Sequence, residues 1–135
     1  PADGYTLFFS TATNMNTAQF LQKDLPYHPE KDFIPVVGLG QAHSILIAGN
    51  HIGVNTTREL IDRLKANPGK LNHASNSAST LLLSELFKAE TKTEFVDVNY
   101  RGGSQSVTDT MNGVTDFCFI DLGELGDWQT FRFGK

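Results

Sequence analysis

Hydrophobic positions in the first part of the chain gather into three short, nearly continuous runs. They lie at residues 5–9 (YTLFF), 33–40 (FIPVVGLG) and 43–49 (HSILIAG). Runs of this length, rich in aromatic and β-branched residues, are typical of strands that are covered on both faces. Between the first two runs, a mixed segment predicts a short helix at residues 17–22 and then an irregular connection that contains proline. This part is therefore predicted to hold three strands and one short helix.

Beyond residue 55, apolar strands alternate regularly with amphipathic helical segments. The predicted helices lie at residues 56–66, 79–90, 103–113 and 122–131. The predicted strands lie at residues 71–75, 94–100 and 116–120. This alternation, with its short connections, predicts an α/β fold in which a parallel-rich sheet is flanked by helices.

The helix predicted at residues 56–66 has the clearest start and end. Thr56 and Glu59 have the spacing of a capping box, so we interpret the sequon Asn55-Thr56-Thr57 as a helix start rather than a glycosylation site. Three apolar residues share one face of this helix, namely Leu60, Ile61 and Leu64. The turn residues at 67–69 (NPG) then end it.

Composition and charge limit the classes of function. The 135 residues are 39% hydrophobic and 19% charged, which suits one globular domain or two small lobes. The formal net charge is −4 and no cluster of Lys or Arg offsets it, so we expect neither a nucleic-acid partner nor an anionic membrane surface. The sequence contains no apolar run of about 18 residues that would span a membrane. Its single cysteine, Cys118, excludes an internal disulfide.

The residue types that usually catalyse reactions do not form a recognisable site. Cys118 alternates within an apolar strand, which predicts a buried structural thiol. The four histidines show no metal-ligand spacing, and the sequence has neither a Walker loop nor a G-x-S-x-G motif. We therefore expect a protein that binds a small molecule without catalysis, and we expect no metal and no cofactor.

In open α/β sheets, ligands bind beyond the carboxyl ends of the strands, so the strand-to-helix junctions form the candidate site. Four junctions are small and polar: residues 10–14, 75–80, 100–104 and 121–123. At 75–80 (SNSAST) we expect neither a first-turn acid nor a capping box, because the first acid is Glu85. The positive end of that helix would then be open to an anion such as a carboxylate. An ordinary N-cap made by Ser, Thr or Asn is the other interpretation.

The other junctions also allow two interpretations each. Gly102 and Gly103 let the backbone approach a ligand and Arg101 offers it a guanidinium, or the three form a tight turn with a solvated Arg101. Asp121 accepts from a ligand hydroxyl or ammonium, or it caps the next helix. Because these junctions are rich in donors and poor in reactive groups, they suit the holding of a small anion.

Six stretches of the sequence resemble a known family: ADGYTL, LPYHPEKDFIPV, TRELIDRLKANPGKLNHAS, SELFKAE, VNYRGGSQSVTDTMNG and TDFCFIDL. Together they look like the tripartite tricarboxylate transporter solute receptors, the TctC or Bug type of extracytoplasmic binding protein, over nearly all of residues 2–125. The resemblance implies a type II periplasmic-binding-protein fold, in which two α/β lobes close on a small organic anion such as a di- or tricarboxylate. It also implies a periplasmic location and membrane transporter subunits as partners.

The ligand-facing turns of this family fall on named positions of this chain: Ser10, Thr11, Thr13, Ser75, Ser77, Ser79, Thr80, Arg101, Gly102, Gly103 and Asp121. The turn before SELF is shorter than the family's loop and lacks its glycines, so the resemblance implies an altered anion site there. Family members are also expected to be roughly twice as long, as two full lobes require. Residues 1–47 are therefore expected to be part of lobe one with the crossover, and residues 48–135 most of lobe two.

Two alternatives stand beside the receptor. A ligand-sensing domain of a regulator shares this two-lobe fold, and a helix-turn-helix segment upstream would favour it. An enzyme using Cys118 or Asp121 is the other, and reaction of Cys118 with a thiol reagent in the folded state would favour it. If the chain is the central fragment of a receptor, apolar sheet edges are exposed and self-association is expected.

Overall fold

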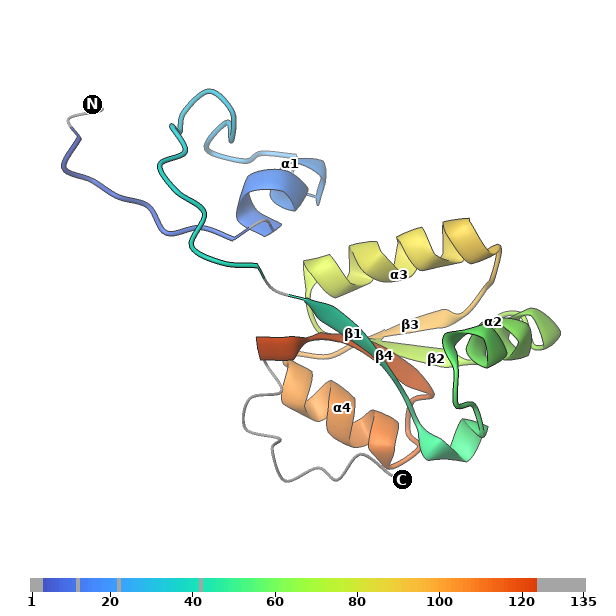
Figure 1. Ribbon diagram of the computed structural model, residues 1–135. Helices are drawn as coiled ribbons and strands as arrows, with labels where there is room; N and C mark the ends of the chain where they lie inside the picture. Colours follow the sequence, from blue (N-terminus) through green and yellow to red (C-terminus); the bar gives the residue numbers. More distant parts are fainter. Residues whose placement is uncertain (1–3, 12, 22, 42, 124–135) are drawn as a thin grey trace. The chain divides into compact units, whose positions relative to one another are not determined.

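The computed structural model describes residues 4–11, 13–21, 23–41 and 43–123. The chain divides into two compact units, Pro1–Leu39 and Gly40–Lys135 (Figure 1). No helix within the described ranges is long and apolar enough to cross a membrane.

The first unit contains little regular structure. A π-helical turn, η1 (Thr13–Thr17), leads into one turn of α-helix, α1 (Ala18–Leu21), close to the predicted helix. The strands predicted at 5–9 and 33–40 are wrong, since both runs are extended but irregular. A strand requires a hydrogen-bonding neighbour, and the sheet of this structure includes neither run.

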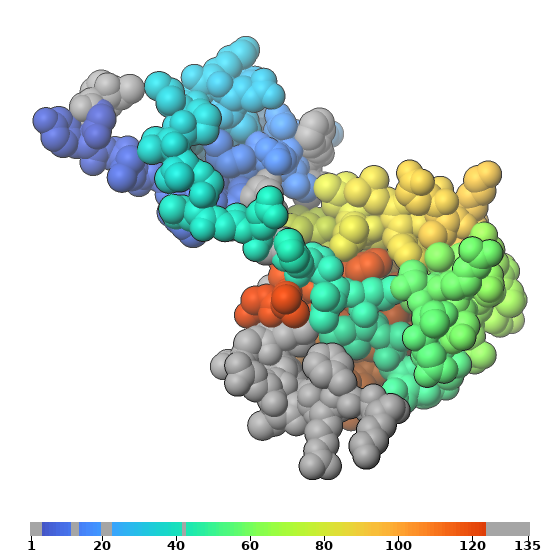
Figure 2. Space-filling model, viewed as in Figure 1, coloured from blue at the N-terminus to red at the C-terminus, as the bar shows by residue number. Residues whose placement is uncertain are grey.

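Aromatic contacts and exposed apolar side chains characterise these two runs. Phe33 stacks on Phe8 with ring centroids 5.3 Å apart and meets Tyr27 edge-on at 5.5 Å. Tyr5 and Leu7, in contrast, are 93% and 82% exposed. In the space-filling view, the blue stretch that contains them forms an extended strip of surface (Figure 2). The apolar pattern here therefore does not mark a buried strand.

The second unit is built on a four-stranded sheet with the order β1-β4-β2-β3. Its strands are β1 (Ser44–Ala48), β2 (Asn72–Ser75), β3 (Val96–Asn99) and β4 (Phe117–Asp121). Strands β2, β3 and β4 are parallel, as the alternation of helices and strands predicts. β1 runs antiparallel to β4. The expected parallel-rich α/β sheet is therefore confirmed, with one antiparallel strand at its edge.

Helices cover both faces of this sheet. They are η2 (Asn50–Ile52, a 3₁₀ turn), α2 (Thr57–Ala66), α3 (Ala78–Thr91) and α4 (Gly103–Met111). In Figure 1, α3 and α4 lie on opposite sides of the strands. The helix predicted at 122–131 lies outside the described residues, except for its first two positions.

The side chains of β4 alternate between two cores. Phe117 and Phe119 belong to the cluster that α2 and α3 cover, whereas Cys118 and Ile120 belong to the cluster beneath α4. All four are buried. A central strand that is buried on both faces explains why its sequence is a continuous apolar run. The predicted burial of Cys118 is confirmed.

Helix α2 begins and ends where its sequence predicts. The Thr56 hydroxyl accepts from the Glu59 amide at 3.2 Å, and the helix ends at Ala66, before Asn67. The second arm of the predicted capping box differs, because Glu59 Oε2 accepts from the amide of Asn55 at 2.7 Å. Leu60 and Leu64 are fully buried on the inner face, and Ile61 is half-buried beside them.

Candidate ligand-binding site

The carboxyl ends of β2, β3 and β4 meet at one edge of the sheet. Ser75 pairs in register with Asn99 of β3, and Asp121 of β4 pairs with Ser44 of β1. Because α3 and α4 begin just after β2 and β3, their N-termini lie at this same edge. The structure thus brings eight predicted site residues to it: Ser75, Ser77, Ser79, Thr80, Arg101, Gly102, Gly103 and Asp121.

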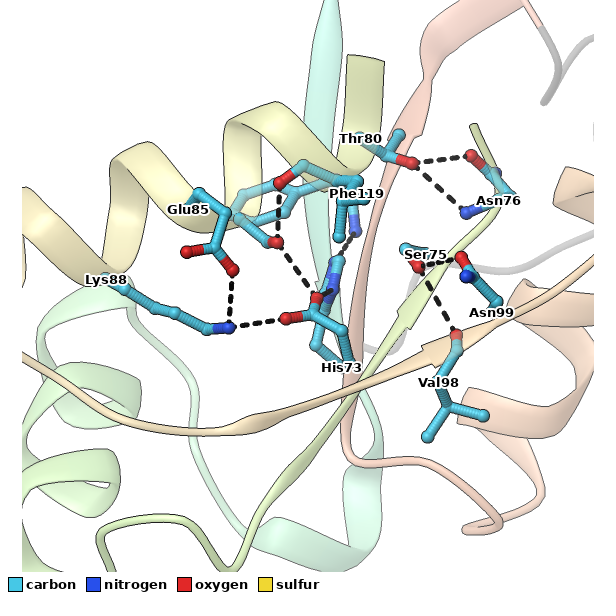
Figure 3. Close-up of polar contacts among 12 residues, drawn as sticks. His73, Ser75, Asn76, Thr80, Glu85, Lys88, Val98, Asn99 and Phe119 are labelled. Carbon is cyan, nitrogen blue, oxygen red and sulfur yellow. Dashed lines mark hydrogen bonds and ion pairs between the residues drawn. The ribbon is translucent and has the colours of Figure 1, made fainter. Parts of the chain in front are cut away.

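Ser75 holds a neighbouring strand rather than facing solvent. Its side chain is fully buried, and its hydroxyl donates to Asn99 Oδ1 at 2.9 Å (Figure 3). The Val98 carbonyl lies further away, at 3.5 Å. This contact fixes the end of β3 beside the end of β2. Ser75 therefore shapes the edge, and a direct contact with a ligand stays a prediction.

The expectation that no capping box closes the start of α3 is wrong. The Thr80 amide donates to Ser77 Oγ at 3.2 Å, and the Ser77 amide donates to Thr80 Oγ1 at 3.0 Å. The expectation failed because it required Glu or Gln at the third helical position, whereas Thr80 performs the same role. The helix start therefore satisfies part of its own donor demand, which favours the capping interpretation for these two hydroxyls.

Asn76 carries an unusual polar atom at this junction. Its Oδ1 accepts from Thr80 Oγ1 at 3.0 Å, and its backbone amide donates to the same hydroxyl oxygen at 3.1 Å. Its Nδ2 is buried and has no hydrogen-bond partner among the described residues. Buried polar atoms are normally paired, so the side-chain Nδ2 of Asn76 is an unusual unsatisfied donor at the edge of the sheet.

The start of α4 is less closed than the start of α3. Its N-cap is Gly102, which has no side chain to bond to the first-turn amides. A Cβ atom at Gly102 would meet nothing within 4 Å, so the surrounding space is open. Arg101 is exposed beside it, and α4 has no acid in its first turn. The partial positive charge of this helix end is therefore accessible at the edge.

Asp121 is already engaged by another side chain. The Ser44 hydroxyl donates to Asp121 Oδ1 across the β1–β4 pair. The negative charge of Asp121 would repel an anion at this edge. Its second oxygen can still accept a hydrogen bond from a hydroxyl group. The role predicted for Asp121 toward a ligand hydroxyl stays a prediction.

Three predicted site residues belong to the first unit. The Ser10 hydroxyl donates to the Thr11 carbonyl at 3.4 Å, and the same carbonyl accepts from the Met15 amide at 3.2 Å. Thr11 is exposed, and Thr13 begins η1. These residues follow the first apolar run and lead into η1, and their contact with a ligand stays a prediction.

The sequence pattern does not single out a polar network that the structure places behind the edge. His73 Nδ1 lies 2.7 Å from Asp97 Oδ1, and Lys88 Nζ pairs with the other oxygen of Asp97. The Ser84 hydroxyl lies 2.9 Å from Asp97 Oδ1 (Figure 3). Only knowledge of the strand register could have revealed this network from the sequence, because His73 and Asp97 are direct partners in the β2–β3 ladder.

Burial and hydrogen bonding oppose each other in this network. Burial lowers the pKa of His73 below its ordinary value, although the hydrogen bond to Asp97 works in the other direction. Burial would raise the pKa of Asp97, but hydrogen bonds from Lys88, His73 and Ser84 together hold it below its ordinary value. The stable arrangement near neutral pH is therefore a neutral His73 beside an ionised Asp97.

Two shallow depressions of the second unit lie away from the edge. One is lined by Ala48, Val54 and Leu60 near the start of α2, and the other lies between α2 and the end of α3. Neither includes a predicted site residue. Ala48 pairs with Phe117, so the first depression is at the opposite end of β4 from Asp121. Both depressions are therefore separate from the candidate site.

Comparison with known proteins identifies the family. The model of the tripartite tricarboxylate transporter family receptor matches residues 1–128 of this chain. The chain belongs to this family. The predicted TctC-type membership is thereby confirmed, and the family is one of receptors. The regulator and enzyme alternatives are not favoured.

Individual members of the receptor family give the extent of the likeness. A UPF0065 protein of Pseudomonas sp. (strain P51) is 32% identical over 118 residues, which are 86% of this chain and 35% of that relative. That relative is therefore more than twice as long as this chain, a larger excess than the sequence predicts. The chain spans little more than a third of the curated relatives it matches.

Solved structures show the receptor fold. A protein from R. palustris, solved with adipate, aligns with a TM-score of 0.80 and 25% identity, covering 96% of this chain and 44% of that chain. The periplasmic binding protein BugD aligns with a TM-score of 0.68 over 87% of this chain and 40% of that chain, at 20% identity, and so supports the fold alone. The expected periplasmic-binding-protein fold is confirmed.

Proposed function

We propose that this chain is the part of a periplasmic receptor that binds a small organic anion, such as a di- or tricarboxylate. In this proposal the receptor delivers its solute to the membrane subunits of a tripartite transporter. The family assignment supports the receptor role. The R. palustris relative was solved with adipate, a dicarboxylate, which supports this class of ligand.

One observation carries the proposal: α3 and α4 both begin at the carboxyl edge of the sheet, after the neighbouring strands β2 and β3, and neither helix has an acid in its first turn. Each helix start carries a partial positive charge and backbone amides that point outward. Helix α2, in contrast, has Glu59 in its first turn and begins at the other end of the sheet. Two helix starts at one edge of the sheet, both without a first-turn acid, are suited to a carboxylate.

The hydrogen bonds at the edge refine which groups would touch the anion. The Ser77 and Thr80 hydroxyls are occupied by the capping box, and the Ser75 hydroxyl is buried against Asn99. We therefore assign the anion contact to the backbone amides at the start of α3 and to Gly102 and Arg101 at the start of α4. The shortened loop then binds through its backbone rather than through its hydroxyls.

The second unit supplies this edge, and ligand contact by Ser10, Thr11 and Thr13 of the first unit is a separate part of the proposal. The division into residues 1–47 of lobe one and residues 48–135 of lobe two belongs to the same proposal. It predicts weak binding by the present chain, because an anion held from one side loses part of its contacts.

Amide chemical shifts of the 135-residue chain, titrated with adipate, test the proposal. We expect saturable shifts at the first-turn amides of α3 and α4, and none at Thr57–Glu59, the matched first turn of α2. Arg101→Gln should weaken binding by up to about 5-fold, the range for one exposed ion pair. Arg58→Gln, an exposed arginine on α2, is its control. Shifts of equal size at all three helix starts, or none with any di- or tricarboxylate, would reject the proposal.

A further inference from the structure

A histidine is completely buried among aromatic rings behind the candidate site. The side chain of His73 has no exposed surface. Its ring lies 5.1 Å from the Phe117 ring, 5.3 Å from Phe119 and 5.7 Å from Phe95. A polar ring in such surroundings is stable only if both of its nitrogens are hydrogen-bonded.

The partners of the two nitrogens fix the protonation state of His73. The amide of Phe119 lies 3.3 Å from Nε2, and because a backbone N–H can only donate, Nε2 must accept. The ring proton is then on Nδ1, which donates to Asp97 Oδ1 at 2.7 Å. Both bonds exist together only in the neutral tautomer that carries its proton on Nδ1.

Asp97 connects the strand before the candidate junction to the helix after it. On one side it accepts from His73 of β2, and on the other from Ser84 at 2.9 Å and from Lys88, both of α3. Strand β2 and helix α3 are consecutive, with Asn76 and Ser77 between them. The Asp97 carboxylate therefore braces the body of α3 against β2, the two elements on either side of this turn.

We propose that Asp97 is a positioning residue that holds the N-terminus of α3 in place at the anion site, and that protonation of His73 releases this brace in acid. The inference rests on the proposed function, since the site it positions is the proposed anion site. It adds a regulation: solute is held near neutral pH and released as the surroundings become acidic.

Protonation acts on the Phe119 side of the ring. A proton on Nε2 would point at the Phe119 N–H, so that two donors face each other inside an aromatic cluster. The ring must then move away from β4 and takes with it the oxygen that Asp97 offers to Ser84. The movement reaches α3 through Ser84, which is fully buried and has one proton to donate, either to Asp97 Oδ1 at 2.9 Å or to the Leu81 carbonyl at 2.8 Å, so displacement of the carboxylate changes the hydrogen bonding within that helix.

The groups around His73, taken together, also favour the neutral ring over the protonated one. Among the described residues, Asp97 of β3 faces it directly, and Lys88 and Glu85 of α3 lie behind Asp97. Asp97 favours a charged His73, but burial outweighs this contribution and the charge of Lys88 opposes it, so the pKa of His73 stays lowered. β4 presents only rings and the Phe119 amide, and α2 contributes Leu60 and Leu64 to the same core cluster. Within the ranges that the structure describes, Asp97 is the one carboxylate that acts on the charge of this ring.

The test compares adipate affinity at neutral and acidic pH in the wild-type chain, His73→Gln and His51→Gln. Glutamine keeps one acceptor and one donor but does not titrate. His51 is the matched control, because it also pairs with a carboxylate, Asp116 at 3.1 Å, but its side chain is 37% exposed. The ratio of wild-type to His73→Gln affinity at each pH cancels the ionisation of adipate itself. We expect it to fall by about 5-fold or more on acidification, the lower range of site-to-site coupling.

A second measurement separates this inference from the proposed function. Amide hydrogen exchange in the first turn of α3, corrected for intrinsic pH dependence, needs no ligand. We expect acid to increase it in wild type and in His51→Gln but not in His73→Gln. If wild type does not bind adipate, the proposed function fails, while the exchange data still decide whether the brace exists. Equal pH dependence of exchange in wild type and His73→Gln would overturn the inference.

Asp97→Asn and Ser84→Ala test the brace itself. Asp97→Asn should raise α3 exchange and weaken adipate binding at every pH, and it should abolish most of the acid effect. If Asp97→Asn does not fold, Ser84→Ala removes one contact between α3 and the carboxylate and leaves the His73–Asp97 bond intact. Wild-type exchange and affinity in both folded variants would contradict a positioning role.

Discussion

Ser77 and Thr80 cap one another at the start of α3: each hydroxyl oxygen accepts from the backbone amide of the other residue. Thr80 is also buried, so its hydroxyl has no access to water as an alternative partner. Thr80→Val preserves the side-chain shape but removes this acceptor. We expect the free energy of unfolding to fall by about 1 to 2 kcal/mol, the upper range for loss of a cap. Urea unfolding measures it, with exposed Thr57→Val at the start of α2 as the control. Equal losses in both variants would show that the capping box contributes nothing.

Stability should depend on pH through His73. Its pKa is lowered in the folded chain, so between that value and the ordinary value of 6.5 the unfolded chain binds more protons. The contribution of His73 to the free energy of unfolding is therefore complete above about pH 6.5, and it is lost as the pH falls through the pKa of the folded chain. Asp97, whose pKa is also lowered, adds a loss of the same sign nearer pH 4. Urea midpoints between about pH 5 and pH 8 should decline in wild type and much less in His73→Gln. A flat wild-type profile would contradict this prediction.

Cys118 should be unreactive in the folded protein. It is fully buried on the α4 face of β4, and burial raises the pKa of its thiol to about 11. Because the thiolate is the reactive form, a thiol reagent near pH 8 should label Cys118 only when the sheet opens. The labelling rate should therefore increase with urea in parallel with unfolding. Rapid labelling without denaturant would return the enzyme alternative to consideration.

The exposed apolar strip near the start of the chain should promote self-association. Tyr5, Leu7 and Phe9 are all largely exposed on an extended segment that belongs to no sheet in this structure. Contiguous exposed apolar side chains favour contact with other chains. Light scattering should show a mass that rises with concentration, and Leu7→Lys with Phe9→Lys should reduce this rise. Leu82→Lys, an exposed leucine of α3, is the control for added charge. A concentration-independent monomer mass would contradict the prediction.

Local chemistry predicted the second unit well. Thr56 and the turn after Ala66 delimit α2, and the continuous apolar run at 117–120 marks a strand that is buried on both faces. These features depend on neighbours within a few positions, so a single sequence reveals them. The same holds for the polar junctions, because the carboxyl ends of parallel strands always meet at one edge.

Long-range pairing accounts for what the sequence did not reveal. The runs at 5–9 and 33–40 have the composition of strands, but composition does not supply the neighbouring strand that a ladder requires. His73 and Asp97 are 24 positions apart, and only the β2–β3 register brings them together. Thr80 was missed for a local reason, since threonine is an uncommon third-position partner in a capping box.

The position of β4 in the sheet has a consequence for biosynthesis. β4 lies between β1 and β2, yet it follows both along the chain, and the Ser44–Asp121 contact joins residues 77 positions apart. Until residues 117–121 leave the ribosome, β1 has no neighbour and β2 has one open side. Closing so long a loop is slow relative to forming the helices. The nascent chain therefore spends a period with helices formed and strand edges unpaired, and during this period it is most exposed to pairing with other chains.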